Sequence, residues 1–302
     1  MSDNELIEQQ NPRFANRRRL LLAGGLAGAA ATVLSACTPI AKADSKTALG
    51  GDDLLAKIVK DKKVRLGVDL TFQPLQFKDS SGKPTGYAVE LTEMIFKDLN
   101  VKIEWVEMEF AQLFAGLVAN KFDLAGIAAT ILPSRAAQVL FSSQPAFLES
   151  NVLLVRPGLT LKSEDDLNSP NMTIAVLSGS SQEAAVPLLY PKAKSKSLGN
   201  QEAIQDVASG RSDVTLLSEF NIADALKKFP KLTLFKSATS FADVNTYFVP
   251  QGQNSMKAFI DNSLLYYASH GTLKGLWNKW IGDQATSAGL PTVPVTLPYL
   301  AN

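Results

Sequence analysis

The sequence predicts an α/β protein built from two lobes, each with a mostly parallel sheet flanked by helices. Strand-like runs alternate with helical runs along the chain, and this alternation is typical of βαβ units. The alternation restarts after Arg156-Pro157-Gly158, which indicates a second lobe, although no strict internal repeat is visible. The chain has 302 residues, 46% of them hydrophobic, which is enough to bury the cores of one large or two ordinary domains.

The first forty residues have the pattern of an export signal. Three arginines, Arg17 to Arg19, precede an apolar run from Leu20 to Leu34 that only Thr32 interrupts. This run is shorter than the roughly 18 to 20 apolar residues that span a bilayer, so we expect cleavage of a signal peptide over residues 1–36. The adjacent arginines resemble a twin-arginine signal, which exports proteins that have already folded.

Cys37 is the only cysteine of the chain. It closes the segment Leu34-Ser35-Ala36-Cys37, which resembles the lipobox of bacterial lipoproteins, so we expect lipidation of Cys37 and a membrane anchor. Cleavage after Ala41-Lys42-Ala43 is the alternative and would give a soluble periplasmic protein. The lipobox is favoured because an unpaired thiol is otherwise unwelcome outside the cell.

The first lobe is expected to begin at residue 54, after a flexible tether of small and polar residues over 37–53. In its first long helix, Leu91, Ile95 and Leu99 fall four residues apart and form one buried stripe. The predicted strands and helices of this lobe are Val64–Val68, Tyr87–Leu99, Lys102–Met108, Ala111–Ala119 and Asp123–Ala128.

The second lobe is expected over residues 155–245, after which the chain returns to the first. Lys192, Lys194 and Lys196 are interpreted as a solvated loop within it. Its predicted elements are Thr173–Leu177, Gln182–Leu189, Gln201–Ala208 and Val214–Leu217. The returning segment comprises Tyr247–Val249, Ser255–Ser269 and Thr272–Ile281. The first lobe is therefore 54–154 with 246–290, hinges lie near 152–156 and 239–246, and 291–302 is an extended tail.

Charge and residue counts exclude several classes of function. The chain has 30 Lys and Arg against 29 Asp and Glu, so its net charge of +1 does not suggest nucleic acid as a partner. A single cysteine and a single histidine leave little for a disulfide, a zinc site or a Ser-His-Asp triad. We therefore expect a small-molecule or protein partner and no metal or cofactor.

Polar residues follow several predicted strands, at the edge where open α/β sheets bind ligands. These candidates are Asp69, Thr130 with Arg135, Gly179 to Gln182, and Ser218 with Glu219.

Over residues 62 to 282 the chain resembles the family 3 periplasmic solute-binding proteins, which serve ABC importers of amino acids. The segments that carry the resemblance are, in order, Gly67-Val68-Asp69, Gly86–Leu91, Phe110 with Leu113, Lys121-Phe122-Asp123, Thr130 with Arg135, Gly179-Ser180-Ser181, Gly210–Asp213 and Lys279–Gly282. The resemblance implies the type II periplasmic binding protein fold, with a ligand cleft between the lobes and closure by a hinge. It also implies a monomer in the cell envelope that delivers its ligand to ABC permease subunits.

The resemblance assigns Arg135 to the carboxylate of the ligand, because its planar guanidinium can bind a carboxylate with two hydrogen bonds. Ser180, Ser181 and Gln182 match the segment that completes the carboxylate site, and a helix N-terminus suits an anion. Ser180 with Glu183 also reads as a capping box, and the two roles are compatible.

Four further positions match ligand-contacting residues of the family. Thr130 matches a hydroxyl-bearing position, while Phe72 and Phe110 match aromatic residues that pack on the ligand side chain. Asp69 matches a position that faces a basic side chain in some relatives. Each also has an ordinary structural alternative, namely the end of a strand for Thr130, the core for the phenylalanines and a turn for Asp69.

Ser218 departs from the family pattern, because amino-acid binders usually have there the aspartate that pairs with the α-ammonium group. Glu219 could supply the charge only if the strand shifted by one residue, and such a slip turns a side chain to the other face. The leading hypothesis remains a receptor for an amino acid or a related small carboxylate. The rival is an enzyme similar to periplasmic cyclohexadienyl dehydratases, with Glu219 or Glu183 as the acid.

Overall fold

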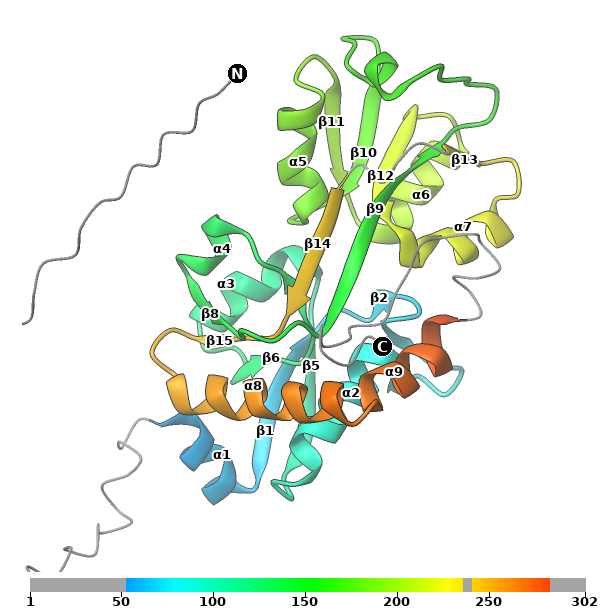
Figure 1. The fold of residues 1–302 in the computed structure, drawn as a ribbon. Coiled ribbons are helices and arrows are strands. Elements are labelled where there is room, and N and C mark those ends of the chain that lie inside the picture. Colours follow the sequence, from blue (N-terminus) through cyan, green and yellow to red (C-terminus); the bar gives the residue numbers. More distant parts are fainter. Residues whose placement is uncertain (1–52, 236–240, 283–302) are drawn as a thin grey trace, which may run out of the picture. The chain divides into compact units, whose positions relative to one another are not determined.

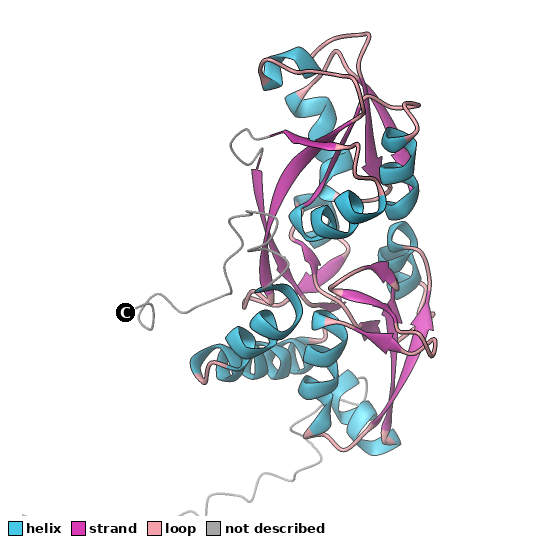
Figure 2. Cartoon of the chain, turned by 90° about the vertical axis from the view of Figure 1, so that its right-hand side faces the viewer, coloured by secondary structure: helices cyan, strands magenta, loops and turns pink. Residues whose placement is uncertain are grey.

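The computed structural model describes residues 53–235 and 241–282, and it confirms an α/β architecture (Figure 1). Figure 2 shows helices on both sides of the strands in the upper and in the lower half of the view. The signal peptide over 1–36, Cys37, the tether up to residue 52 and the tail over 291–302 lie outside the described residues, so those expectations stay predictions. Within the described residues, no helix combines the length and the apolar character needed to cross a membrane.

The first lobe is built on a parallel three-stranded sheet. Its central strand β1 (Lys63–Val68) lies between β5 (Lys102–Glu107) and β6 (Leu124–Ala125), with Lys63 opposite Lys102 and Leu66 opposite Leu124. Val64, Leu66 and Val68 of β1 are fully buried, as expected for a strand with helices on both faces. The predicted strands at 64–68 and 102–108 are thus confirmed.

Helices and short strands complete the first lobe. The predicted helix from Tyr87 is α2 (Tyr87–Lys97), in which Leu91 and Ile95 are buried. The other elements are α1 (Leu54–Asp61), β2 (Thr71–Phe72), β3 (Gln76–Lys78), β4 (Pro84–Thr85), η1 (Phe110–Gln112), α3 (Leu113–Val118), β7 (Ala129–Thr130), α4 (Pro133–Ala136), β8 (Val139–Phe141), β15 (Phe248–Pro250), α8 (Asn254–Ser269), α9 (Thr272–Trp277) and η4 (Asn278–Gly282).

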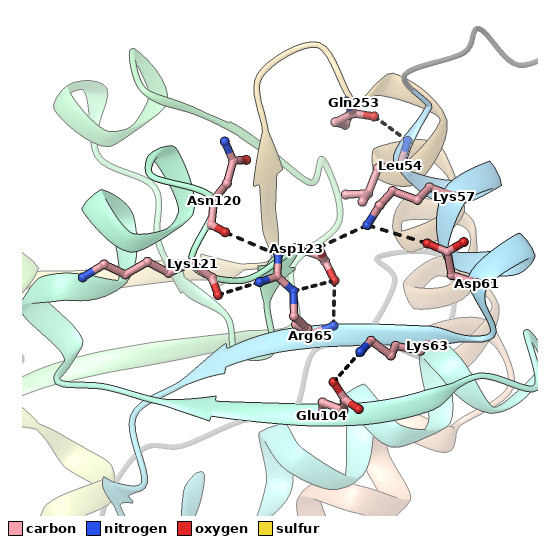
Figure 3. A network of polar contacts seen from close by, with 10 residues as sticks. All are labelled: Leu54, Lys57, Asp61, Lys63, Arg65, Glu104, Asn120, Lys121, Asp123 and Gln253. Carbon is pink, nitrogen blue, oxygen red and sulfur yellow. Dashed lines mark hydrogen bonds and ion pairs between the residues drawn. The ribbon is translucent and has the colours of Figure 1, made fainter.

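Asp123 fixes the amino-terminal edge of this sheet (Figure 3). Its carboxylate accepts hydrogen bonds from the backbone N–H of Arg65 at 2.8 Å and from Arg65 Nη2 at 2.9 Å, and Lys57 Nζ lies 3.6 Å away. Burial alone would raise the pKa of Asp123, but the bonds from Arg65 and the charge of Lys57 outweigh it and hold that pKa below its usual value.

The second lobe repeats the plan. Its parallel strands are β10 (Thr173–Leu177), β11 (Lys194–Leu198) and β12 (Val214–Ser218), with β10 in the centre. The other elements are η2 (Glu164–Leu167), α5 (Ser181–Leu189), α6 (Asn200–Ala208), η3 (Glu219–Asn221), α7 (Ile222–Lys228) and β13 (Thr233–Phe235).

The interpretation of the lysine run as a loop is wrong for two of its three members. Lys194 and Lys196 belong to β11, which ends the path of its sheet. Lysines are common on such edge strands because their charge discourages pairing with another chain. The resulting polar sequence has the composition of a loop, which explains the wrong prediction.

Two long strands cross between the lobes. Strand β9 (Phe147–Val155) pairs antiparallel with β12 in the second lobe and with β14 (Phe241–Thr246), which in turn pairs with β7 of the first lobe. Figure 1 shows β9 and β14 side by side on the way from one half of the view to the other. The chain therefore leaves the first lobe along β9 and returns along β14, and the predicted boundaries and hinges stay predictions.

The two lobes have separate hydrophobic cores that meet at an aromatic cluster. Phe220, which follows β12, packs edge-on against Phe147 and Trp277 with ring centroids 5.7 and 5.6 Å apart. Trp277 is 2% exposed and belongs to the core.

Candidate functional site

A cavity lies where the carboxyl ends of the strands of both lobes meet, and its volume is about 40 Å³. Its walls include seven of the ten predicted ligand residues, namely Phe72, Phe110, Thr130, Ser180, Ser181, Gln182 and Ser218. The first three come from the first lobe and the other four from the second. A space of this size holds only a few water molecules, so a larger ligand requires the walls to move apart.

The N-terminus of α5 supplies hydroxyl and amide groups to the cavity. Ser180 caps the helix as predicted, since its Oγ accepts a hydrogen bond from the N–H of Glu183 at 3.1 Å. The reciprocal bond differs by one residue from the expected capping box, because Glu183 accepts from the N–H of Gly179 at 2.6 Å and not from Ser180. Ser181 and Gln182 are 5% exposed and point toward the crossing strands, which their side chains contact.

Arg135 is buried beside the cavity but does not line it. Its Nη1 donates to the carbonyl oxygen of Thr130 at 2.8 Å, and its Nη2 donates to that of Gly179 at 2.6 Å, so the side chain joins the two lobes. The guanidinium also lies 4.7 Å from the centroid of the Phe114 ring. Burial lowers the pKa of Arg135 to about 10, against the opposing attraction of Asp243 and Glu149, so it stays charged at neutral pH.

Asp69 forms a turn, which was the structural alternative to its predicted contact with a ligand. Its carboxylate accepts hydrogen bonds from the N–H and the hydroxyl of Thr71, at 2.8 and 2.5 Å, and from the N–H of Phe110 at 2.8 Å. These bonds form a turn and hold Phe110 in place, and Asp69 is not among the residues that line the cavity.

Ser218 and Glu219 point in different directions. Ser218 ends β12 and lines the cavity, whereas Glu219 begins η3 and accepts a hydrogen bond from the N–H of Ser150 at 3.1 Å. Glu219 is absent from the cavity lining, as the one-residue argument predicts. Burial raises the pKa of its carboxyl group to about 7.

The crossing strands carry a polar face that was not predicted from the sequence. Glu149 and Asn151 lie on β9, Asp243 and Asn245 lie on β14, and all four are buried. Glu149 and Asn245 line the cavity. In the sequence, the polar residues of these two strands fall at every second position, which indicates that they share one face. Only the pairing of the strands shows that this polar face is buried.

These four residues form one network with α5. Asn245 Nδ2 donates to Glu149 at 2.9 Å, and Asn151 Nδ2 donates to Asp243 at 3.0 Å. Gln182 donates to Asn151 at 2.5 Å and to Glu149 at 3.3 Å, while the hydroxyl of Ser181 donates to Asp243 at 2.6 Å.

The electrostatics of Glu149 set it apart from the paired carboxylates of the protein. Burial raises its pKa to about 7, and the negative charge of Asp243 adds to the effect, while hydrogen bonds from Ser218 and Asn245 oppose it. Its charged form is thus costly in the structure as described. Among the described residues, no group of three or more His, Cys, Asp or Glu side chains could hold a metal ion.

Known proteins are similar to this chain in sequence and in fold. Relatives include a "Probable amino-acid ABC transporter-binding protein" of Haemophilus influenzae, 23% identical over 78% of this chain and 90% of that protein. The "Lysine/arginine/ornithine-binding periplasmic protein" of Escherichia coli is 28% identical over 61% of this chain and 72% of that protein.

Solved structures agree with the described fold. An ancestral amino acid-binding protein, described as a precursor of cyclohexadienyl dehydratase, matches with a TM-score of 0.68 and 30% identity, over 75% of this chain and 98% of that chain. A mutant of ArgBP from T. maritima matches with a TM-score of 0.69 and 25% identity, over 76% and 99%. The fold is therefore that of the type II periplasmic binding proteins, as predicted. The model of the bacterial extracellular solute-binding proteins, family 3, matches residues 64–283, and the chain belongs to this family.

Proposed function

We propose that this protein is the receptor of an ABC importer and that it binds an amino acid, or a related small carboxylate, in the cavity between its lobes. The observation that carries the proposal is the cavity itself, to which both lobes and both crossing strands contribute buried polar groups. The names of the relatives support amino acids as the class of ligand. The receptor acts as a monomer. When its lobes close on the ligand, it presents the surface that the permease recognises.

Ligand capture requires the lobes to separate and close again. Strands β9 and β14 are the natural hinge, because the chain passes between the lobes along them. Arg135 bridges the lobes, because it donates to the carbonyl group of Thr130 in the first and of Gly179 in the second. A guanidinium has five N–H donors, so Arg135 can exchange one of these carbonyls for a ligand carboxylate when the lobes reopen.

The test is a thermal-shift screen of the twenty proteinogenic L-amino acids, L-cystine and simple keto acids, followed by calorimetry on the compounds that raise Tm. A ligand at a hundred times its Kd stabilises the folded state by about 2.7 kcal/mol, which such a screen detects easily. Arg135→Ala should abolish binding, and Arg135→Lys should weaken it, because lysine keeps the charge but loses the planar fork. Unchanged affinity in Arg135→Ala would refute the proposed carboxylate site.

An enzyme on the same fold is the second candidate, because a buried carboxyl group with a raised pKa lines the cavity at Glu149. Incubation with prephenate distinguishes the two candidates. Release of phenylpyruvate above the uncatalysed rate would favour the enzyme, whereas ligand binding without turnover supports the receptor.

We also propose that Cys37 is acylated and tethers the receptor to the membrane. Tethering would raise the effective concentration of the receptor near its permease. Cys37→Ser should move the protein from the membrane fraction to the soluble fraction without a change in ligand affinity. If the unaltered protein is already soluble after export, cleavage after Ala43 is the correct alternative.

A further inference from the structure

The crossing strands form the floor of the cavity, where one carboxylate lines the cavity and a second lies beside the first. Glu149 on β9 lines the cavity and is 5% exposed, and Asp243 on β14 is 8% exposed. They lie directly opposite each other in the strand pair, since Asp243 pairs with Glu149 in the register. Two negative charges are therefore held close together in a place shielded from water.

The side chains that donate hydrogen bonds to these carboxylates are neutral. Glu149 accepts from the amides of Gln182 and Asn245, and Asp243 accepts from the hydroxyl of Ser181 and the amide of Asn151. Within 53–235 and 241–282, no ion pair includes either carboxylate. A buried charge without a cationic partner is unfavourable, so this floor is suited to a cation that arrives from elsewhere.

The charged groups around Glu149 come from three elements. Asp243 on β14 and Glu219 on η3 repel its negative charge. Arg135 on α4 attracts it, but the guanidinium donates its hydrogen bonds to backbone carbonyls. Its charge acts on Glu149 from a distance and leaves the floor of the cavity open to a second cation.

A further side chain of the same cavity lacks a partner. Thr215 lines the cavity and is 1% exposed, and its Oγ1 has no hydrogen-bond partner among the described residues. A polar ligand could satisfy this hydroxyl. Ser218, which also lines the cavity, carries no charge, so it cannot balance a ligand cation.

We infer that Glu149 pairs with a protonated amine of the ligand and that Asp243 reinforces it, so that the crossing strands, and not the end of β12, recognise the ammonium group. The class of ligand is then a small molecule that carries both an amine and a carboxylate. This inference rests on the proposed function. It also places amine recognition on the hinge, where it can favour the closed form.

The test compares pairs of compounds that differ only in the amine. Calorimetry measures the affinity of the unaltered protein and of Glu149→Gln for the L-amino acid with the largest shift in Tm, and for its 2-hydroxy analogue. If that amino acid has a side-chain amine, the analogue lacking that amine is added. Glu149→Gln should weaken binding of the amino acid about 30-fold or more and that of the hydroxy analogue less than about threefold.

Glu219→Gln is the competing variant, because it removes the neighbouring buried carboxylate. Equal loss in Glu149→Gln for the amino acid and for the hydroxy analogue, or loss of amine preference in Glu219→Gln alone, would overturn the assignment. A Tm and a near-UV spectrum like those of the unaltered protein show that Glu149→Gln is folded.

A second measurement needs no variant. The amine favours ionised Glu149, so affinity for the amino acid should rise from about pH 6 to about pH 8 across the pKa of about 7, while affinity for the hydroxy analogue should not. Binding at pH 7 should release protons, which calorimetry in buffers of different ionisation enthalpy detects. No proton release and a flat pH profile for the amino acid would refute the pairing. If no amino acid binds the unaltered protein at all, the proposed function itself fails, which is a separate result.

Discussion

The two lobes use the same device at one edge of their sheets and different residues at the other. In the first lobe, Asp123 precedes β6 and accepts from the N–H of Arg65 at 2.8 Å, while the Arg65 side chain pairs with it. In the second, Asp213 precedes β12 and accepts from the N–H of Thr173 at 2.9 Å, while Nε of Arg156 lies 2.9 Å from it. The sequence shows no strict repeat, yet the lobes share this contact.

At the cavity edge the lobes differ. The first lobe contributes the rings of Phe72 and Phe110, whereas the second contributes Ser181, Gln182 and Ser218. This contrast teaches that the contact that holds each sheet together recurs in both lobes, whereas the side chains that line the cavity differ between them. The electrostatics follow the same division.

Folding shifts the pKa of a carboxylate at the sheet edge and of one at the cavity in opposite directions. Folding lowers the pKa of Asp123, which forms ion pairs, and raises that of Glu149, which forms none among the described residues. The first carboxylate therefore stabilises the fold when charged, and the second destabilises it. Two predictions test this difference.

Asp123→Ala should have the larger effect and lower the free energy of unfolding by about 3 kcal/mol, because it leaves the backbone N–H of Arg65 without its acceptor and removes the ion pair with the Arg65 side chain. Asp213→Ala should cost less, about 1 to 2 kcal/mol, because its side chain is 19% exposed. Urea unfolding at pH 7 measures both. The contribution of the Asp123 carboxylate should begin to decline as the pH falls below about 3.9, the usual aspartate value, and should be lost as the pH falls through its lower pKa in the folded protein.

Asp61→Ala is the matched control for these variants. Its side chain is 44% exposed and its ion pair with Lys57 is 4.0 Å long, so the loss should stay within about 0.5 kcal/mol (Figure 3). A loss in Asp123→Ala no larger than in this control would show that the shared device does not stabilise the sheet.

Glu149→Gln should have a smaller effect of the opposite sign, stabilising the ligand-free protein at pH 8 by roughly 2 kcal/mol. The pKa of Glu149 in the folded protein is about 7, above its ordinary 4.5, so stability falls as the pH rises through this range and stays low above it. The variant cannot ionise there, and its advantage should vanish near pH 4. Chemical unfolding at the two pH values measures the difference.

Glu107→Gln, at an exposed ion pair with Lys78, is the control for this measurement and should show no comparable change between the two pH values. Equal stability of Glu149→Gln and the unaltered protein at pH 8 would mean that Glu149 already has a compensating charge.

Much of the site could be predicted because it follows single strands and helices. Ser180, Ser181, Gln182 and Ser218 lie where the period of the chain places them, at strand ends and at one helix N-terminus. Strand β11 was harder to predict, because it is rich in lysine and serine and shows no apolar alternation.

The sequence by itself determined the α/β class, the duplicated plan and the strand ends where a ligand meets the protein, because hydrophobic periodicity and turn residues act over short stretches of chain. Only the tertiary structure decided the orientation of the charges. It turned Arg135 toward the carbonyls of Thr130 and Gly179, and it buried Glu149 beside Asp243. The reason is physical: the pairing of β9 with β14 joins residues ninety or more positions apart, and neither strand alone specifies what its polar face will contact.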